Sequence, residues 1–451
     1  MMILDALLAG LKQVCAVFPD KRKTADGVYS MADIGLSAFS LFFMQSESFL
    51  AYQRGLEEGR KTSNCHSLFG MAKIPTDNHI RSMLDAVHPS HLQVSFDEAV
   101  GALRAGGGLK AFERLAVCGE NPRTLIALDG TEYYCSQKLG CAQCLTRGRA
   151  NGKTDFYHCM LAATIVAPGH NMAMPLMPEF IANTDGADSS TSAQKQDCER
   201  NAAKRWLVAH GARMQELRPV YLGDDLFACQ PICEAVLAGG GDFLFTAKPD
   251  SHKTLYDFMQ GAELEELRVV RKDGAKKLTF RYRWFCAAPL RSFDNRSGGK
   301  DALNVNWIGL TIADARGKVT YQNAFVTSLP VARGTVAEIA ACARARWKIE
   351  NESFNILKNN GYHLEHNFGH GKQNLAMTFA AMNLLAFAFH TVCDCLEVLW
   401  TQAREAKRAR KRFFEHIRTI TAYLVFPNWQ TLMITLIKSK PPPEIAKQMT
   451  Q

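Results

Sequence analysis

The spacing of apolar and polar positions changes character along the chain. Up to about residue 120, apolar residues recur three and four positions apart, as at Ile34, Ala38, Leu41 and Phe42. This spacing places them on one face of a helix. We therefore predict a helical N-terminal domain over residues 1–120.

From residue 123 the pattern changes to shorter apolar runs that are typical of strands. Three strand-like runs come first, and then helical and strand-like segments alternate. The predicted order is strands at 123–129, 157–166 and 172–181, a helix at 192–214, a strand at 218–225, a helix at 232–239 and a strand at 242–248. This order favours an α/β fold with a mixed sheet under helical cover, whose first part spans 121–262.

Residues 263–332 alternate between apolar and polar positions, with turn signals at Asp273-Gly274 and Arg316-Gly317. Such alternation predicts antiparallel strands, so we expect a β-rich, all-β insertion here. A long helix is predicted to begin at Thr335. It opens the second part of the core at 333–400, and a basic helical C-terminal region follows at 401–451.

An apolar stretch at 375–400 approaches the length of a membrane span. It also contains Asn383, His390, Asp394 and Glu397, which are costly in lipid. We therefore interpret it as a buried core helix and expect no membrane association.

Composition adds weaker constraints. The chain has 451 residues, enough for several domains, and an excess of 53 Lys and Arg over 44 Asp and Glu. The resulting net charge of +9 is a weak indication of a polyanionic partner. The first residues lack a basic leader followed by a cleavage site, and the 14 cysteines are scattered. We expect reduced thiols and a cytoplasmic protein, with one possible metal cluster.

Three acidic residues stand where a phosphoryl-transfer site would need them. Asp129 and Asp224 end predicted strands, and Glu350 lies on the long helix. Such carboxylates suit Mg²⁺ or Mn²⁺, and two ions can assist both the attacking and the leaving oxygen. Helical spacing places Arg346 on the face of Glu350 and Glu352 on nearly the opposite face. The alternative is that the acids are turn, cap or solvated helix residues.

At these positions the sequence resembles a known family. The segments LDGTEYY (128–134), YLGDDLFACQP (221–231) and RWKIENESFNILK (346–358) resemble, in this order, the acidic motifs of DDE transposases of bacterial insertion sequences. The match is to the group with a β-rich insertion before the catalytic Glu, and it spans about 123–375. SFLAYQ and SLFGMAKIPTDNHIRSMLD near the start resemble the same proteins less specifically.

The resemblance implies an RNase-H-like core, Mg²⁺ or Mn²⁺ dependence, and cutting and joining of double-stranded DNA at transposon ends. It also implies a homodimer. The first Asp of the family carries over to Asp129. The second motif, an Asp followed after two residues by an aromatic, points to Asp224 with Phe227 rather than to Asp225.

The third motif of the family has Tyr, two residues, Arg, three residues, Glu, six residues and Lys. Arg346 and Glu350 fit it. The chain departs from the pattern in two places, because Ala343 takes the Tyr position and the Lys stands at Lys358, one residue late. These departures weaken the assignment of a phosphate-binding role to Lys358 more than they weaken the assignment of the acids.

A second cluster predicts a structural zinc site within 135–159. Cys141 and Cys144 are separated by two residues, and His158 follows after thirteen more. Paired thiolates at this spacing form half of a tetrahedral Zn²⁺ site. Cys135 is the expected fourth ligand. Cys159 lies close by, and Cys198 is an alternative fourth ligand. The other interpretation is a set of reduced cysteines without metal.

Several other residues are candidates for contact with DNA. The loop between the zinc ligands carries Arg147, Arg149 and Lys153, which we expect to meet phosphate. His366 and His370 are four apart, but Gly369 and Gly371 favour a loop, so metal binding there is not expected. His366 is predicted to contact DNA or carry a proton, or else to be an ordinary core or surface residue.

Two regions are weaker candidates for DNA binding. Seven basic residues at 403–418 predict contact with the DNA backbone, against the alternative of a solvated helix face. The helical N-terminal domain is the other candidate.

Two alternatives to a transposase remain open at this point. One is a metal-dependent nuclease of the same fold that cuts DNA without strand transfer. The other is a non-catalytic, zinc-containing DNA-binding protein. The nuclease shares the acidic triad with the transposase, whereas the non-catalytic protein does not need it.

Overall fold

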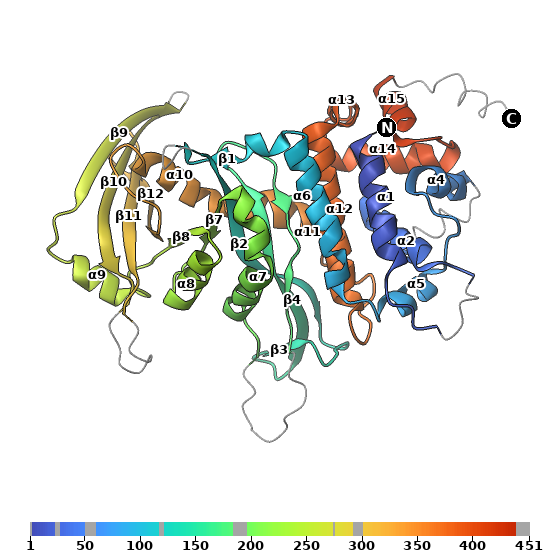
Figure 1. Cartoon of the computed structure of the whole chain (residues 1–451), viewed down its shortest axis with the longest axis horizontal. Coiled ribbons are helices and arrows are strands. Elements are labelled where there is room, and N and C mark those ends of the chain that lie inside the picture. Colours follow the sequence, from blue (N-terminus) through green and yellow to red (C-terminus); the bar gives the residue numbers. More distant parts are fainter. Residues whose placement is uncertain are drawn as a thin grey trace.

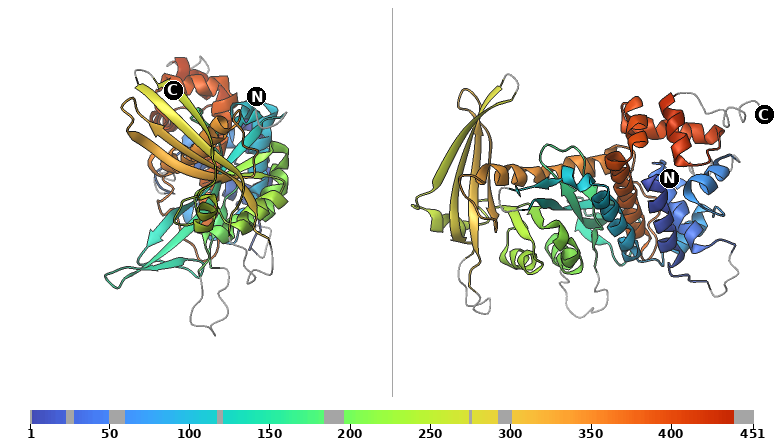
Figure 2. Two further views of the ribbon diagram at one scale, coloured as in Figure 1. Left: turned by 90° about the vertical axis from the view of Figure 1, so that its left-hand side faces the viewer. Right: turned by 45° about the horizontal axis from the view of Figure 1, so that its top comes forward.

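A single mixed sheet links the middle of the molecule to one of its ends. The computed structural model describes residues 2–22, 28–49, 60–116, 121–183, 196–273, 276–291 and 301–438. Helices from the two ends of the chain gather at one end of the molecule, and strands β9–β12 form the other (Figure 1). Two further views show the same arrangement (Figure 2).

The central part of the sheet contains antiparallel and parallel strands. β2 (Arg123–Ser136) pairs antiparallel with β4 (Thr154–Val166) and parallel with β7 (Pro219–Gly223), and β7 pairs parallel with β8 (Asp242–Thr246). The short strands that complete this part are β1 (Glu113–Arg114) beside β2, and β3 (Leu145–Gly148), β5 (Met174–Pro175) and β6 (Glu179–Ile181) beside β4.

Alternate side chains of the sheet enter two different cores. Ile126 and Leu128 belong to the core that also contains residues of α7 (Glu199–Met214) and α8 (Gln230–Ala238). Leu125 and Ala127 belong to the second core, which is shared with α10 (Val336–Arg344). Because successive side chains of a strand point to opposite faces, Asp129 lies on the face of Leu125 and Ala127.

The strands between β8 and α10 extend the same sheet. β12 (Val319–Thr327) pairs antiparallel with β8, and β11 (Asn304–Ala313), β10 (Lys276–Pro289) and β9 (Glu265–Asp273) follow in order. A short helix, α9 (Lys253–Met259), precedes them. The predicted alternation therefore corresponds to real strands, and Tyr282 and Trp284 are buried beside α10. Part of the predicted turn at Asp273-Gly274 lies outside the described residues.

The N-terminal and C-terminal parts of the chain are helical and pack together. The first group comprises α1 (Ile3–Ala16), α2 (Met31–Phe43), α4 (Arg60–Phe69), α5 (Asp77–Leu84) and α6 (Gln93–Ala105), with single 3-10 turns at Pro89–Leu92 and Gly108–Ala111. The second comprises α12 (Leu375–Leu396), α13 (Val398–Ala406), α14 (Arg410–Tyr423) and α15 (Trp429–Lys438). Residues 439–451 and part of the SFLAYQ segment lie outside the described residues.

Helix α12 joins these groups to the sheet. It contacts α2 and α6 on the helical side and β5 on the sheet side. By length and hydropathy it passes as a membrane span, yet 94% of its apolar window is buried inside the protein. The expectation of a buried core helix is therefore confirmed.

Candidate functional site

Asp129 and Asp224 meet because β2 and β7 are parallel neighbours. The register pairs Thr124 with Pro219 and continues to Ala127 with Leu222. The same offset places Asp129 level with Asp224. Asp224 directly follows β7, whereas Asp129 lies within β2, which continues to Ser136, so the prediction that Asp129 ends its strand is wrong. The Asp224 carboxylate also accepts a hydrogen bond from the backbone N–H of Leu226 (2.8 Å), which holds the turn after β7.

The guanidinium of Arg346 links the helix after β12 to Asp129 on β2. Arg346 Nη1 lies 3.1 Å from Asp129 Oδ2, and Arg346 Nη2 lies 2.8 Å from Glu350 Oε1. Arg346 therefore bridges Asp129, which is 217 residues away in sequence, and Glu350. The predicted pairing of Arg346 with Glu350 one turn later is present.

The helix is irregular where it carries Glu350. A 3-10 turn at Ala345–Trp347 is followed by a π-helical turn at Glu350–Phe354 and then α11 (Asn355–Asn359). The long regular helix expected from Thr335 is therefore interrupted. Single π-turns within helices often mark functional sites, because the extra residue re-aims a side chain. Glu352 lies 4.0 Å from Lys348 rather than beside Arg346.

Burial and neighbouring charge act on the Asp129 carboxyl together. Burial raises its pKa from 3.8 to about 7; Arg346 opposes this rise, and the charges of Glu350, Asp224 and Glu199 add to it. Asp129 is only 19% exposed. A half-buried carboxyl beside three other carboxylates favours a cationic ligand, and such perturbed groups concentrate at functional sites.

Glu199 is a fourth acid that the sequence reasoning missed. It begins α7, and its carboxylate lies against Gly130, where any larger residue would collide with it. Burial raises the pKa of Glu199, and the charge of Asp224 raises it further. The one sequence signal for this contact was the glycine that directly follows Asp129.

The neighbouring acid Asp225 faces elsewhere. Its carboxylate accepts a hydrogen bond from the backbone N–H of Lys248 (2.5 Å) and lies 3.2 Å from His252 Nε2. These contacts tie Asp225 to the turn before α9. The choice of Asp224 over Asp225 as the acid nearest Asp129 agrees with this geometry.

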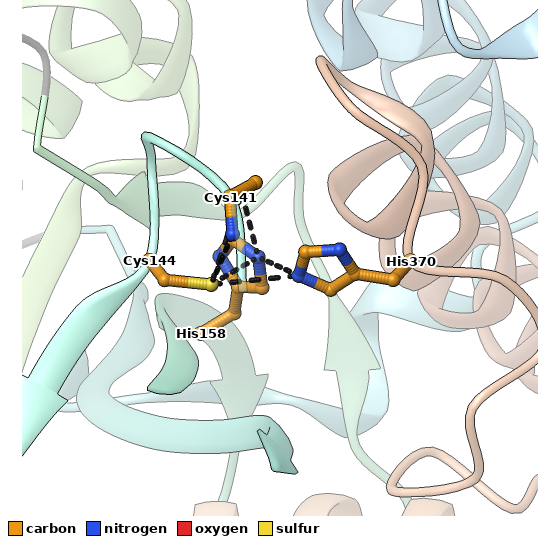
Figure 3. Close-up of side chains that lie close together, drawn as sticks. All are labelled: Cys141, Cys144, His158 and His370. Carbon is orange, nitrogen blue, oxygen red and sulfur yellow. Dashed lines mark hydrogen bonds between the residues drawn. The ribbon is translucent and has the colours of Figure 1, made fainter. Parts of the chain in front are cut away.

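Two cysteines and two histidines form the other candidate site (Figure 3). Cys141 and Cys144 come from the loop before β3, His158 from β4 and His370 from the loop before α12. All four ligand atoms lie within 4.8 Å of one another, so the group could hold a metal such as zinc. Cys144 and His158 are almost fully buried.

The contacts of the four side chains support a metal-binding role. A hydrogen bond with Cys144 lowers the pKa of the Cys141 thiol, and those with His158 and His370 lower it further, although burial opposes them. The same hydrogen bond and burial raise the pKa of Cys144, so without a metal the pair favours one thiolate, on Cys141. Metal ligation needs the thiolate form. Tyr133 stacks on His158 with ring planes 14° apart, and Tyr134 lies against His370.

This group corrects two of the sequence expectations. Cys135, the expected fourth ligand, is exposed and lies outside the group. Cys159 and Cys198, which are partly buried, also lie outside it. The fourth position belongs to His370, for which metal binding was not expected. The glycines at 369 and 371 do place it in a loop, but a loop residue can ligate when other segments hold the loop in place.

The predicted DNA-contacting residues near the zinc loop are engaged within the protein. Arg149 Nε lies 2.7 Å from Asp155 Oδ1, and Arg147 lies 3.2 Å from Glu132 and 3.4 Å from Asp155. Arg147 also stacks over Tyr157. Both arginine side chains are 49% exposed, so their ion pairs leave part of each guanidinium at the surface.

The remaining predicted residues, Lys358 and His366, lie between His158 and His370 in sequence. Lys358 Nζ lies 2.8 Å from Glu365, and His366 is exposed with its ring against Phe368. His366 is not among the four clustered ligands.

In the basic C-terminal stretch, some charges hold the fold. Arg404 and Arg410 both pair with the buried Asp394, and Arg418 donates to the backbone carbonyls of Met44 and Gln45. These three are therefore not free for DNA, although the stretch is helical as expected.

Among the described residues, the Cys/His group is the one set of close ligand atoms that could share an ion. The carboxylates of Asp129, Asp224 and Glu350 do not form such a set, and Arg346 lies between two of them. Comparison with protein-family models and with curated proteins gives no match for this chain.

Proposed function

We propose that this protein is a DNA transposase with an RNase-H-like core, in which Asp129, Asp224 and Glu350 form the catalytic triad. The observation that carries the proposal is the meeting of three separate segments at two neighbouring interior strands of the sheet. Parallel pairing of β2 with β7 sets Asp129 beside Asp224, and Arg346 connects Asp129 to Glu350. The sheet, with β4 antiparallel to β2 and with β7 and β8 parallel to it, supports the core assignment.

The donor set of this site fits Mg²⁺ or Mn²⁺. These cations prefer carboxylate oxygens and retain positions for water and phosphate. Asp129, Asp224 and Glu350 would hold them, with Glu199 close by. When bound, such cations supply charge neutralisation for a phosphodiester that is being cleaved or joined.

The protein's own groups have distinct roles in the proposed reaction. Arg346 orients Asp129 and Glu350, and as a planar donor it suits a DNA phosphate. The burial of Asp129 gives it a rigid position. Positioning and electrostatics are the main contributions that a protein makes to phosphoryl transfer.

A basic surface on β9 and β10 supports DNA as the partner. Lys272 lies opposite Lys277 and Arg268 opposite Arg281, on the face turned away from the buried Tyr282 and Trp284. Like charges directly opposite one another destabilise a sheet. Glu266 pairs with both Arg268 and Arg281, so the facing pair Lys272 and Lys277 is the one that a polyanion would neutralise.

The test uses purified protein, Mg²⁺ or Mn²⁺, and labelled DNA that carries the sequences flanking the gene. We expect metal-dependent cutting and joining by the wild type, and loss of both in Asp129→Asn and Asp224→Asn with DNA binding retained. Asp225→Asn is the matched control, because its carboxylate faces Lys248 and His252.

The alternatives give different outcomes in the same assay. Cutting without joining would favour the nuclease. Tight DNA binding without products, unaffected by the Asp129 and Asp224 substitutions, would favour the non-catalytic protein. Equal loss of activity in Asp224→Asn and Asp225→Asn would contradict the proposed assignment of the second acid.

A further inference from the structure

We propose that Cys141, Cys144, His158 and His370 bind one Zn²⁺, and that this ion fastens the segment following the Glu350 helix to the hairpin following Asp129. The site predicted from sequence was local to one loop. Recruitment of His370 makes it a link between two distant parts of the chain. The inference concerns a structural ion and does not depend on the proposed catalytic function.

Five of the six distances between ligand atoms match a zinc tetrahedron, and the sixth, from Cys141 to His370, is within 4.8 Å. Zn–S bonds of about 2.3 Å and Zn–N bonds of about 2.0–2.1 Å predict separations of about 3.8 Å for S–S, about 3.6 Å for S–N and about 3.3 Å for N–N. The Cys141 and Cys144 sulfurs are 3.7 Å apart, and the sulfur-to-His158 distances are 3.6 and 3.4 Å. Cys144 Sγ lies 3.4 Å from His370 Nε2, and the two histidine nitrogens are 3.1 Å apart.

The ligand chemistry distinguishes zinc from the cations proposed for the acidic site. Two sulfurs and two imidazole nitrogens suit Zn²⁺, whereas Mg²⁺ and Ca²⁺ require oxygen. His370 Nδ1 donates to the backbone carbonyl of Gly371 at 3.1 Å, which leaves Nε2 to face the other ligands. Such second hydrogen bonds fix the orientation of a metal-binding imidazole.

The position of His370 in the chain gives the ion its clamping role. His158 and His370 are 212 residues apart, and His370 lies between α11 and α12. His158 lies on β4, opposite Tyr134 of β2. An ion that joins them connects the strand of Asp129 to the segment that leaves the helix of Glu350.

The loop with His370 is held on its other side by α5. The Asp85 carboxylate, directly after α5, accepts hydrogen bonds from the backbone N–H groups of Lys372, Gln373 and Leu375 at 3.0–3.1 Å. Arg81 Nε donates to the carbonyl of Phe368 at 2.9 Å. The zinc would complete this attachment from the side of the sheet.

The first test measures the zinc content of untagged protein purified without chelator. We expect one zinc per chain in the wild type, and loss of it in Cys144→Ser and His370→Ala. Cys135→Ser and His366→Ala are matched controls that should keep it, because both residues lie close in sequence but outside the group. His370→Cys restores a ligand and should retain zinc even if His370→Ala folds poorly.

Two further readouts test the geometry and the clamp. Co²⁺ in place of zinc should give the visible absorption of a tetrahedral site with thiolate charge transfer. Hydrogen exchange of residues 361–374 should become faster when zinc is removed. Wild type without zinc and without the cobalt spectrum, or His370→Ala with undiminished zinc affinity, would overturn the proposal, as would unchanged exchange in this loop. None of these readouts uses DNA, so they remain informative if the transposase proposal fails.

Discussion

The acidic site includes Asp129 of β2 and the Cys/His site includes His158 of the neighbouring strand β4, but the two sites differ in what holds them together. In the acidic site, Asp129 is a half-buried carboxyl surrounded by other carboxylates, and one guanidinium opposes their repulsion. In the Cys/His site, four soft or neutral donors already converge at zinc-like distances. The first arrangement is unfavourable for folding, whereas the second becomes favourable once a metal binds. Sites built for chemistry often show the first pattern, and structural ions the second.

The largest expected difference between the sites is in their response to zinc. Free zinc at 1,000 times its Kd would add about 4 kcal/mol to the unfolding free energy. We therefore expect a chelator to destabilise the wild type and Cys135→Ser strongly, and to leave Cys144→Ser unchanged. Urea unfolding with zinc and with chelator measures this. An unfolding free energy of the wild type that the chelator leaves unchanged would contradict a structural role for zinc and the proposed difference between the two sites.

Asp129→Asn should stabilise the protein at alkaline pH in metal-free buffer. Because the pKa of Asp129 is raised in the folded state, the protein is most stable with respect to this group below its ordinary pKa of 3.8. That contribution to the free energy of unfolding is lost as pH rises through about 7. Three pH units correspond to about 4 kcal/mol, which solvent screening reduces to on the order of 2 kcal/mol.

Unfolding at pH 8 and pH 4 tests this prediction. The increase in unfolding free energy caused by Asp129→Asn should be present at pH 8 and absent at pH 4. Asp242→Asn is the contrasting control, because Asp242 pairs with Arg123 and its loss should destabilise the protein. Destabilisation by Asp129→Asn at pH 8 would show that its carboxylate is structurally favourable, contrary to the comparison.

The coupling of Arg346 to Asp129 should be a smaller effect. A partly buried ion pair at 3.1 Å is expected to contribute about 1 kcal/mol. A double-mutant cycle with Arg346→Gln and Asp129→Asn measures the coupling directly. The same cycle on Lys348 and Glu352, 4.0 Å apart, should give a value close to zero. Equal couplings would contradict a special role for Arg346.

The smallest expected effect is on the basic face of β9 and β10. Lys272→Gln or Lys277→Gln should weaken DNA binding uniformly across sequences and reduce the salt dependence by roughly one unit of slope per lost phosphate contact. Arg271→Gln is the control, since Arg271 stacks over Phe280 on the opposite face. Binding titrations at several salt concentrations measure the affinity and the salt slope of each variant. Effects of Arg271→Gln equal to those of the lysine substitutions would argue against a DNA-facing surface.

Local patterns predicted much of the fold. Periodicity predicted the strands that begin at 123 and 157, the alternating helices and strands up to 248, the alternation at 263–332 and the buried helix at 375. The strand predicted at 172–181 is instead two short strands, β5 and β6, and β3 was not predicted. Periodicity did not reveal that β12 joins β8 and extends the core sheet, because strand pairing over long separations leaves no local signal. The π-turn at Glu350 was also missed, since spacing arguments assume a regular helix.

The candidate sites were predictable only where their members are close in sequence. The Cys141–Cys144 spacing identified half of the metal group, and His158 completed three of its positions. His370 and Glu199 are recruited by tertiary folding. The glycines around His370 even pointed away from ligation. For Glu199, the contact with Gly130 becomes visible only once α7 packs on β2.

The central claim is that Glu350 belongs to a site that joins DNA ends, and a strand-transfer assay tests it most directly. A pre-cut DNA end with a free 3′ hydroxyl is supplied with Mn²⁺ and a circular target to the wild type, Glu350→Gln and Glu352→Gln. We predict joined products with the wild type and Glu352→Gln, and a loss on the order of 10³-fold with Glu350→Gln at undiminished DNA binding. Full strand transfer by Glu350→Gln, or its loss in Glu352→Gln alone, would contradict the proposed site.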